Sequence, residues 1–363
     1  MRHMSSRRIL AMLLALMLVF STMSVMAFAE EADENAPAGE GNTSSQVSAN
    51  GMSYDTLEAA FAVADPDENG TITYAINGTV TVDGTGWIQV VKAGLDSESV
   101  KAVKFVGIGS DAGIRVTQSA AVLADQSYSI DVSFENLTLV KENPVYLPDY
   151  AETTQYFAML LRNKDAAENT VTYTNCVFPK GVINSSYGKT VFNNCNFGND
   201  GTIEGNKYNL WVKDGSVTLN GGTFTGARGV KVYETSSETA TLTLNGTTFS
   251  GLTDKAAIVV SKPSNITLSG VSVTDCTVGL ITRDITGKDE LTIAANGSGI
   301  NGTFNVTDKT NAEAAKEEFN ITAGTFNSGI SKDYLAEGFT INKDGTVQEE
   351  ASYNAVVKIG DVE

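Results

Sequence analysis

Carboxylates are numerous in this sequence and are the first side chains to consider for chemistry. The 363 residues include 43 Asp+Glu and a single His, His3. Without further histidines the chain lacks a Ser-His-Asp triad, a His-ligated zinc and an imidazole base. Glycoside hydrolysis needs only two carboxyl groups about 5 to 9.5 Å apart. Asp214, Glu234 and Asp284 follow comparable short apolar segments, but solvated turns explain them better than a catalytic groove does. We therefore assign no catalytic residue.

Aromatic and basic residues form a second candidate group. They occur at corresponding places in short apolar segments that end near residues 162, 213, 233 and 283. Aromatic faces stack on sugars, and Arg or Lys bind acidic groups. We expect these side chains to face outward and to bind a glycan or a protein. An ordinary strand surface with the loop 146–156 packed over it is the alternative. The predicted ligand-binding residues are Arg162, Trp211, Lys213, Tyr233 and Arg283.

One segment suggests a calcium loop, but only in part. Asp65, Asp67, Asn69 and Gly70 match the first half of an EF-hand loop. Position 12 of that pattern is Ile76 instead of the bidentate Glu. We therefore interpret residues 65–72 as a turn and predict no metal and no cofactor.

The three cysteines do not have the spacing of a metal site or of a disulfide framework. Cys176 and Cys195 each precede an apolar residue by two positions, so we expect them to stack as buried, reduced thiols. Cys276 lies outside that pattern.

The N-terminus reads as an export signal. Basic residues in 1–8 precede an apolar run, Ile9–Phe20, and an Ala-x-Ala site at Ala27–Ala29. We predict a signal peptide at 1–29, with an uncleaved membrane anchor as the alternative. Residues 30–50 are acidic, small and polar, and we expect a flexible leader. No later apolar stretch reaches membrane-spanning length, so we expect no membrane contact after cleavage.

An internal repeat dominates the rest of the chain. Each unit has a short strand of alternating apolar residues, a bend with Asn or Gly, and a second apolar residue. The residues after the bend form the first column: Leu139, Phe178, Phe197, Phe224, Phe249, Val273 and Phe326. Five positions earlier stand Phe134, Tyr173, Phe192, Leu219, Leu244, Leu268 and Ile321, and seven positions earlier stand Val132, Val171, Thr190, Val217, Leu242, Ile266 and Phe319.

A second strand recurs with the same period. It opens at Met159, Val182, Leu210, Val230, Ile258 and Leu280. Two strands in each repeat indicate a chain wound about one axis, with like residues stacked about 4.8 Å apart. A β-sandwich would not show this period six times, and a β-propeller needs a longer repeat.

The repeat resembles the right-handed parallel β-helix of the pectin-lyase-like group found in secreted bacterial surface proteins. The resemblance covers about residues 52 to 345, including LNGTTF and NGGTF. It implies an all-β, single-stranded solenoid. A helix starting at Asp55–Glu58 would cap its first coil, and the segment 333–339 would close the last one. We predict a parallel β-helix at 51–345. Residues 346–363 would form a tail and resemble 47–57, as if a second module began there.

The predicted function is a secreted, non-catalytic surface module, adhesin-like, that binds a glycan or a surface protein. A polysaccharide lyase or glycoside hydrolase on the same scaffold and a structural spacer are the alternatives, because fold does not decide function. The net charge of −18 argues against nucleic acid and anionic membranes as partners. We expect a monomer that is secreted or held at the cell surface.

Overall fold

The computed structural model divides the chain into two units, Met1–Ser44 and Ser45–Glu363. All of the residues that it describes belong to the second unit. They are 46–82, 86–89, 99–116, 120–123, 130–141, 170–179, 182–184, 189–198, 208–212, 215–226, 228–232, 240–252, 256–260, 264–274, 278–282, 291–296, 299–300, 303–306, 321–326 and 330–351.

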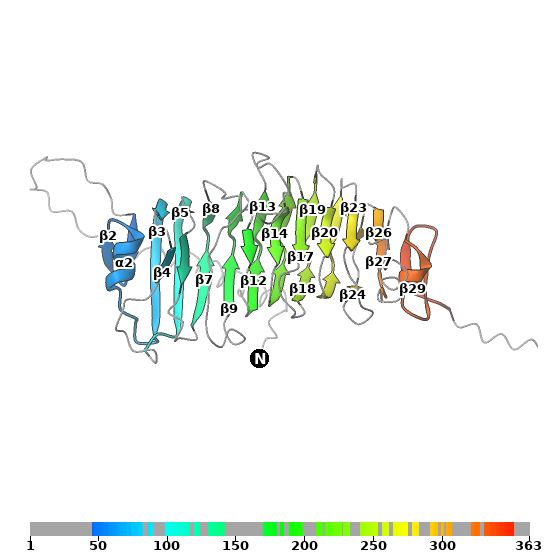
Figure 1. The fold of residues 1–363 in the computed structure, drawn as a ribbon, viewed down its shortest axis with the longest axis horizontal. Helices are drawn as coiled ribbons and strands as arrows, with labels where there is room; N and C mark the ends of the chain where they lie inside the picture. The colour runs from blue at the N-terminus through cyan, green and yellow to red at the C-terminus, as the bar shows by residue number, and fades with distance from the viewer. Residues whose placement is uncertain are drawn as a thin grey trace, which may run out of the picture. The chain divides into compact units, whose positions relative to one another are not determined.

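The described part of the chain is an all-β structure made mainly of parallel strands (Figure 1). A 21-stranded sheet contains two strand rows joined by bends. The first row is β3 (Thr71–Val82), β5 (Ala102–Val116), β7 (Asp131–Glu135), β9 (Thr170–Thr174), β12 (Lys189–Asn193), β15 (Ser216–Asn220), β18 (Ala240–Asn245), β21 (Ser264–Ser269) and β24 (Leu291–Asn296). The second row is β8 (Thr138–Lys141), β10 (Val177–Phe178), β13 (Asn196–Gly198), β16 (Thr223–Thr225), β19 (Thr248–Ser250), β22 (Ser272–Thr274), β25 (Gly299–Ile300) and β27 (Gly324–Phe326).

A separate six-stranded sheet is parallel throughout. Its strands are β11 (Val182–Asn184), β14 (Tyr208–Val212), β17 (Arg228–Val232), β20 (Ala256–Val260), β23 (Val278–Thr282) and β26 (Thr303–Val306). Two further parallel strands, β4 (Gly86–Gln89) and β6 (Ala120–Leu123), pair with each other. In every row the strands follow one another in chain order, as the repeat predicts (Figure 1).

The predicted columns are in register. Phe197 pairs with Phe178 and Phe224, and Phe224 pairs with Phe249. The rings of these four residues stack with centroid distances of 4.9, 4.4 and 4.7 Å. In the first row Phe105, Phe134, Tyr173 and Phe192 stack at 4.8, 5.0 and 4.8 Å. Stacked rings therefore fill much of the buried core.

The bend between the two rows uses left-handed backbone conformations. Asn136, Asn175 and Asn194 have φ angles of 56°, 53° and 52°, and in later repeats Gly221, Gly246 and Gly270 take over this role. Asn and Gly are the residues that adopt this conformation at least cost. Asn or Gly therefore recurs at this position of the repeat because the bend requires a left-handed backbone conformation.

One coil was missed in the sequence prediction. In the predicted column Phe326 follows Val273 directly. In the structure Val273 pairs with Ile300 of β25, and Ile300 in turn pairs with Phe326. The strands β24 and β25 therefore form an additional coil between those of Val273 and Phe326. Ile321 does not continue the Leu268 column, which passes to Ala295; it forms an isolated bridge with Leu335 instead. An alanine at a column position gives little hydrophobic signal in the sequence, which explains the error.

Both ends of the parallel rows are antiparallel. At one end β1 (Val47–Ala49) pairs with β3 and with β2 (Met52–Tyr54) through a turn at Asn50 and Gly51. At the other end β29 (Thr346–Glu349) pairs with β27 and with β28 (Phe339–Ile341), which follows the short 3₁₀ helix η1 (Lys332–Tyr334). The ranges predicted as leader, 30–50, and as tail, 346–363, thus each contain a strand of the sheet, β1 and β29.

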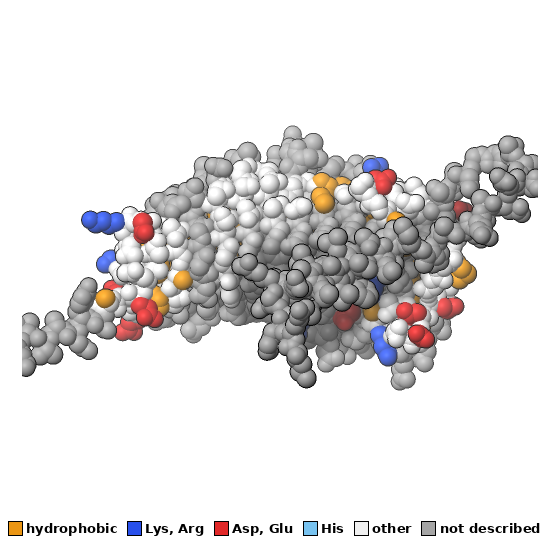
Figure 2. Space-filling model, turned by 180° about the vertical axis from the view of Figure 1, so that it is seen from behind, with side chains coloured by type: hydrophobic (Ala, Val, Ile, Leu, Met, Phe, Trp, Pro, Cys, Tyr) orange, Lys and Arg blue, Asp and Glu red, His pale blue; other side chains and the backbone are white. Residues whose placement is uncertain are grey.

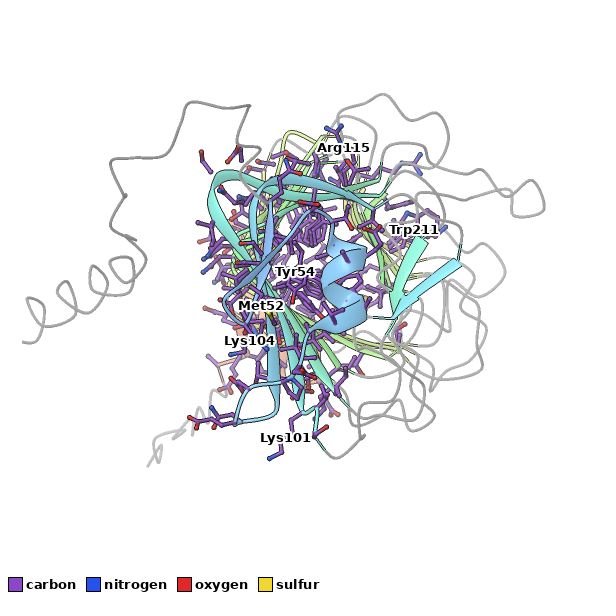
Figure 3. The ribbon with its side chains drawn as sticks, turned by 90° about the vertical axis from the view of Figure 1, so that its left-hand side faces the viewer. Met52, Tyr54, Lys101, Lys104, Arg115 and Trp211 are labelled. Carbon is purple, nitrogen blue, oxygen red and sulfur yellow. The ribbon has the colours of Figure 1, made fainter. Side chains whose placement is uncertain are left out.

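The predicted N-terminal helix is present as α2 (Leu57–Val63). The Thr56 side chain caps it by accepting a hydrogen bond from the backbone N–H of Ala59 at 3.1 Å. Phe61 packs edge-on against Tyr74 and Phe105, with centroid distances of 5.0 and 6.0 Å. In the view along the rows, α2 lies in front of the interior side chains (Figure 3).

Among the described residues, no helix combines the length and hydrophobicity needed to span a membrane.

Candidate functional site

Trp211 is the one predicted site residue that the structure describes. It lies on β14 between Leu210 and Val212, which belong to the core, so its side chain is on the outer face of the six-stranded sheet. In Figure 3 it lies on the opposite side of the coil from Lys104 of the long sheet. Arg162, Lys213, Tyr233 and Arg283 lie outside the described residues, and their part in a site stays a prediction.

Around Trp211 the structure shows an aromatic–cation cluster, which we define as Tyr208, Trp211, Arg228 and Lys231. The rings of Tyr208 and Trp211 meet edge to face at 5.3 Å. The Lys231 Nζ lies 5.0 Å from the Trp211 ring centroid and 5.5 Å from that of Tyr208, and the Arg228 guanidinium lies 5.0 Å from Tyr208. Cation–π contacts of this kind stabilise a cation away from water.

The predicted exposure of Trp211 was wrong. Trp211 is 3% exposed, Lys231 is 2% exposed and Val259 is fully buried. Strand alternation predicts on which side of a sheet a residue lies, but it does not predict what covers that side. The aromatic–cation cluster is therefore covered by the chain itself, and it is not an open binding surface.

A different outward surface, made mainly of half-buried residues, was not anticipated. It is the outer side of the first strand row from β9 to β21, which we call the hydroxyl face. Its residues alternate with buried core residues along each strand. They are Thr170, Thr172, Thr174, Lys189, Val191, Asn193, Ser216, Thr218, Asn220, Thr241, Thr243, Asn245, Thr267 and Ser269.

The hydroxyl face is nearly free of charge. Lys189 is the only charged residue among those that define it. Charged outward residues appear next to it, at Lys104 of β5 and at Asp131 and Glu135 of β7. In Figure 2 most of the described charged side chains that are visible lie toward the two ends of the view. For a chain with a net charge of −18, this surface is unusual in composition.

Neighbouring residues of the hydroxyl face are in strict register. Thr172, Val191, Thr218, Thr243 and Thr267 form one column along the row. In the next column Asn220 donates to the Asn193 Oδ1 and Asn245 donates to the Asn220 Oδ1, each at 2.9 Å. These hydrogen bonds, which we call the asparagine chain, fix the side chains of Asn193, Asn220 and Asn245. The threonine column lies beside them with its hydroxyl groups facing outward.

The strip along the second row has the same character. Asn196, Thr223, Thr225, Thr248 and Ser250 face outward there, and the Thr223 hydroxyl donates to the Asn196 Oδ1 at 2.8 Å. The threonine alternation in strings such as TVTYT and SVTLN was the available signal, but it was interpreted only as strand pattern.

Cys176 and Cys195 lie in neighbouring coils, as predicted, and both are free and buried. The Cys176 Sγ lies 3.4 Å from the Phe134 carbonyl oxygen, and the Cys195 Sγ lies 3.5 Å from the Tyr173 carbonyl oxygen. The hydrogen bond with Cys176, followed by burial, raises the pKa of the Cys195 thiol far above its usual value. Both thiols are buried among core residues, and buried structural cysteines are inert, so this pair packs the core. Cys276 lies outside the described residues.

The segment with half of a calcium loop forms a turn. The Asp67 carboxylate accepts hydrogen bonds from the backbone N–H groups of Asn69 and Thr71, at 2.8 and 2.9 Å. These bonds use one carboxylate oxygen for the turn before β3, as is typical of Asp in such turns. Within the described ranges, no three His, Cys, Asp or Glu side chains lie close enough together to hold a metal ion.

The fold and surfaces define a class: an all-β protein with long rows of parallel strands, compatible with a parallel β-helix. In comparisons with known proteins, no family model, no curated protein and no solved structure matches the chain.

Proposed function

We propose that the chain is a right-handed parallel β-helix, capped by α2, that acts outside the cell as a non-catalytic module and binds a glycan or a protein. The in-register rows and the chain order of the strands support the β-helix. The packing of Phe61 onto Tyr74 and Phe105 supports the role of α2 as a cap. The resemblance to secreted surface proteins and the N-terminal signal pattern support export.

The hydroxyl face is the observation that carries binding. It extends over five consecutive strands of the first row, from β9 to β21. Parallel strands lie about 4.8 Å apart, so the face spans on the order of 20 Å. A strand scaffold holds such a surface rigid, so binding loses little conformational entropy from ordering it. Hydroxyl and amide groups then provide donors and acceptors at fixed spacing.

A glycan array and a turnover assay, both with the full chain, test this function. We expect binding to glycans or proteins without product release from polysaccharides. Release of products from a polysaccharide would show that the protein is a lyase or hydrolase instead. If neither binding nor turnover is observed, a structural spacer is the remaining function.

A charge-insertion variant locates the binding surface. Thr218→Glu combined with Thr243→Glu places two carboxylates at the centre of the hydroxyl face, and we expect about tenfold weaker binding or more. Gln348→Glu is the control, since Gln348 is exposed on β29 at the far end of the sheet. Equal binding by both variants would remove the hydroxyl face from the proposal. Binding lost in Arg283→Ala instead would favour the residues predicted from sequence.

A further inference from the structure

We propose that the ligand of the hydroxyl face is an uncharged polysaccharide, hydrogen-bonded to the threonine column of β9, β15, β18 and β21. This inference rests on the proposed function, because it names the ligand of the same surface. Three properties of the described residues carry it: their charge, their hydrogen-bonding groups and their lack of large apolar side chains.

Charge selects against acidic ligands. The chain carries 43 acidic residues against 25 basic ones, so an anionic polymer meets net repulsion as it approaches. Binding many carboxylates or sulfates requires several Arg or Lys residues. The hydroxyl face offers only Lys189. A neutral polymer experiences no such repulsion and needs no cation.

Hydrogen bonding matches a polymer that is rich in hydroxyl groups. Each threonine hydroxyl donates one hydrogen bond and accepts others, as does each sugar hydroxyl. Among the described residues, no side chain or backbone group forms a hydrogen bond with the hydroxyls of Thr172, Thr218 and Thr243. Register places the last two in adjacent strands, Thr218 directly beside Thr243. Beside them the Asn220 amide uses one N–H and its Oδ1 within the asparagine chain, which leaves its second N–H for a ligand.

Side-chain type disfavours a protein partner. The cores of protein interfaces are enriched in Tyr, Trp, Phe, Met and Arg. The hydroxyl face contains none of these residues, and Val191 is its one apolar side chain. The exposed large apolar residues of the described chain lie elsewhere, at Met52, Val63, Ile108 and Val177.

The experiment removes hydroxyl groups without changing shape. The triple variant Thr172→Val, Thr218→Val, Thr243→Val keeps a β-branched side chain, which suits strands, at every position. Binding of the full chain to three soluble neutral polysaccharides (a β-glucan, a galactomannan and a xyloglucan) is measured by calorimetry, with polygalacturonate as the acidic comparison. We expect the parent chain to bind a neutral polymer and the triple variant to bind it at least about tenfold more weakly.

Thr340→Val is the matched control, because Thr340 is a partly exposed threonine on β28, outside the hydroxyl face. Its binding should equal that of the parent chain. Thermal unfolding of all variants verifies that they are folded. If the triple variant fails to fold, the single variants Thr218→Val and Thr243→Val carry the same comparison with smaller losses.

Unchanged neutral binding in the folded valine variants overturns the inference. So does tighter binding to polygalacturonate than to every neutral polymer, or binding to a protein alone, and in both cases the proposed binding function still stands. If the chain binds no polysaccharide and no protein, the proposed function fails together with the inference.

Discussion

Two glycines beside strands of the second row differ in why glycine is needed, Gly222 just before β16 and Gly251 just after β19. Gly222 has a φ of +82°, and a Cβ there would lie 2.2 Å from the Cys195 carbonyl oxygen in the neighbouring coil. Gly251 has a φ of +60°, but a Cβ there would meet nothing within 4 Å. A side chain at Gly251 would meet only the strain of the left-handed conformation. At Gly222 it would also overlap with the backbone of the neighbouring coil.

We expect Gly222→Ala to destabilise the protein much more than Gly251→Ala. A left-handed alanine costs about 1–2 kcal/mol in either place. Only at Gly222 must the backbone of an adjacent coil also move, so the loss there should exceed that value severalfold. Urea unfolding of both variants measures the difference. Equal losses would show that neighbouring coils do not approach as closely as described.

Ionisation of Tyr173 makes the free energy of unfolding decrease at alkaline pH. Burial, and then the neighbouring thiols of Cys176 and Cys195, raise the pKa of its phenol above the usual value. A raised pKa means that the folded state holds the proton more tightly than the unfolded state does. Its contribution to stability is therefore complete below the unfolded pKa of about 10 and is lost as pH rises above it.

Tyr173→Phe should accordingly flatten the loss of stability above pH 10. One group contributes at most about 1.4 kcal/mol per pH unit to that slope. Chemical unfolding of parent and variant between pH 8 and 12 tests this, with pH 8 as the internal reference. Parallel curves across the whole range would mean that the phenol ionises without unfolding.

At the scale of elements, the aromatic columns hold the coils together. The Phe224 ring stacks on Phe197 and Phe249, at 4.4 and 4.7 Å. Deleting a buried phenylalanine costs about 3–5 kcal/mol. In a repeat architecture each coil contacts mainly its neighbours, so the damage should be local.

We therefore expect Phe224→Ala to accelerate amide hydrogen exchange first in β13, β16 and β19. Exchange in β3 and β29, near the two ends, should change little. Hydrogen exchange with mass spectrometry resolves these segments. Uniform acceleration along the sheet would indicate one cooperative unit instead of coupled coils.

The sequence was sufficient to predict these columns because identical environments recur. The column from Leu139 to Val273 has the predicted neighbours, and so does the six-stranded row from Val182 to Leu280. The prediction failed where Ala295 replaces a large residue and where strands turn antiparallel, at Val47 and Thr346. Periodicity detects repetition, but it is insensitive to small residues and to a change of strand direction.

The candidate site was less predictable than the fold for a physical reason. Alternation placed Trp211 on the outer side correctly, but it gave no information on the cover that leaves the residue 3% exposed. Conversely, threonine is common in any strand, so the hydroxyl face was hidden in ordinary strand propensity. Its distinguishing feature is the lack of charge over several aligned strands, which becomes visible only when the register is known.

At the scale of the whole molecule, the net charge of −18 arises almost entirely outside the hydroxyl face, whose one charged residue is Lys189. Binding of a neutral polysaccharide should therefore change less than about twofold between 50 and 500 mM salt, because no ion pairs are screened. Calorimetry at both salt concentrations measures this. A tenfold loss at high salt would point to contacts through charged groups.

The reversal of strand direction at both ends has a consequence for growth into fibres. A row of parallel strands with an open end is a template on which another chain can add in the same orientation. Here β1 and β29 run antiparallel to the rows, and β2 and β28, which pair with them, run in the direction of the rows again. An incoming chain therefore meets a short hairpin strand that lies outside the stacked columns, and it does not continue the repetitive core directly.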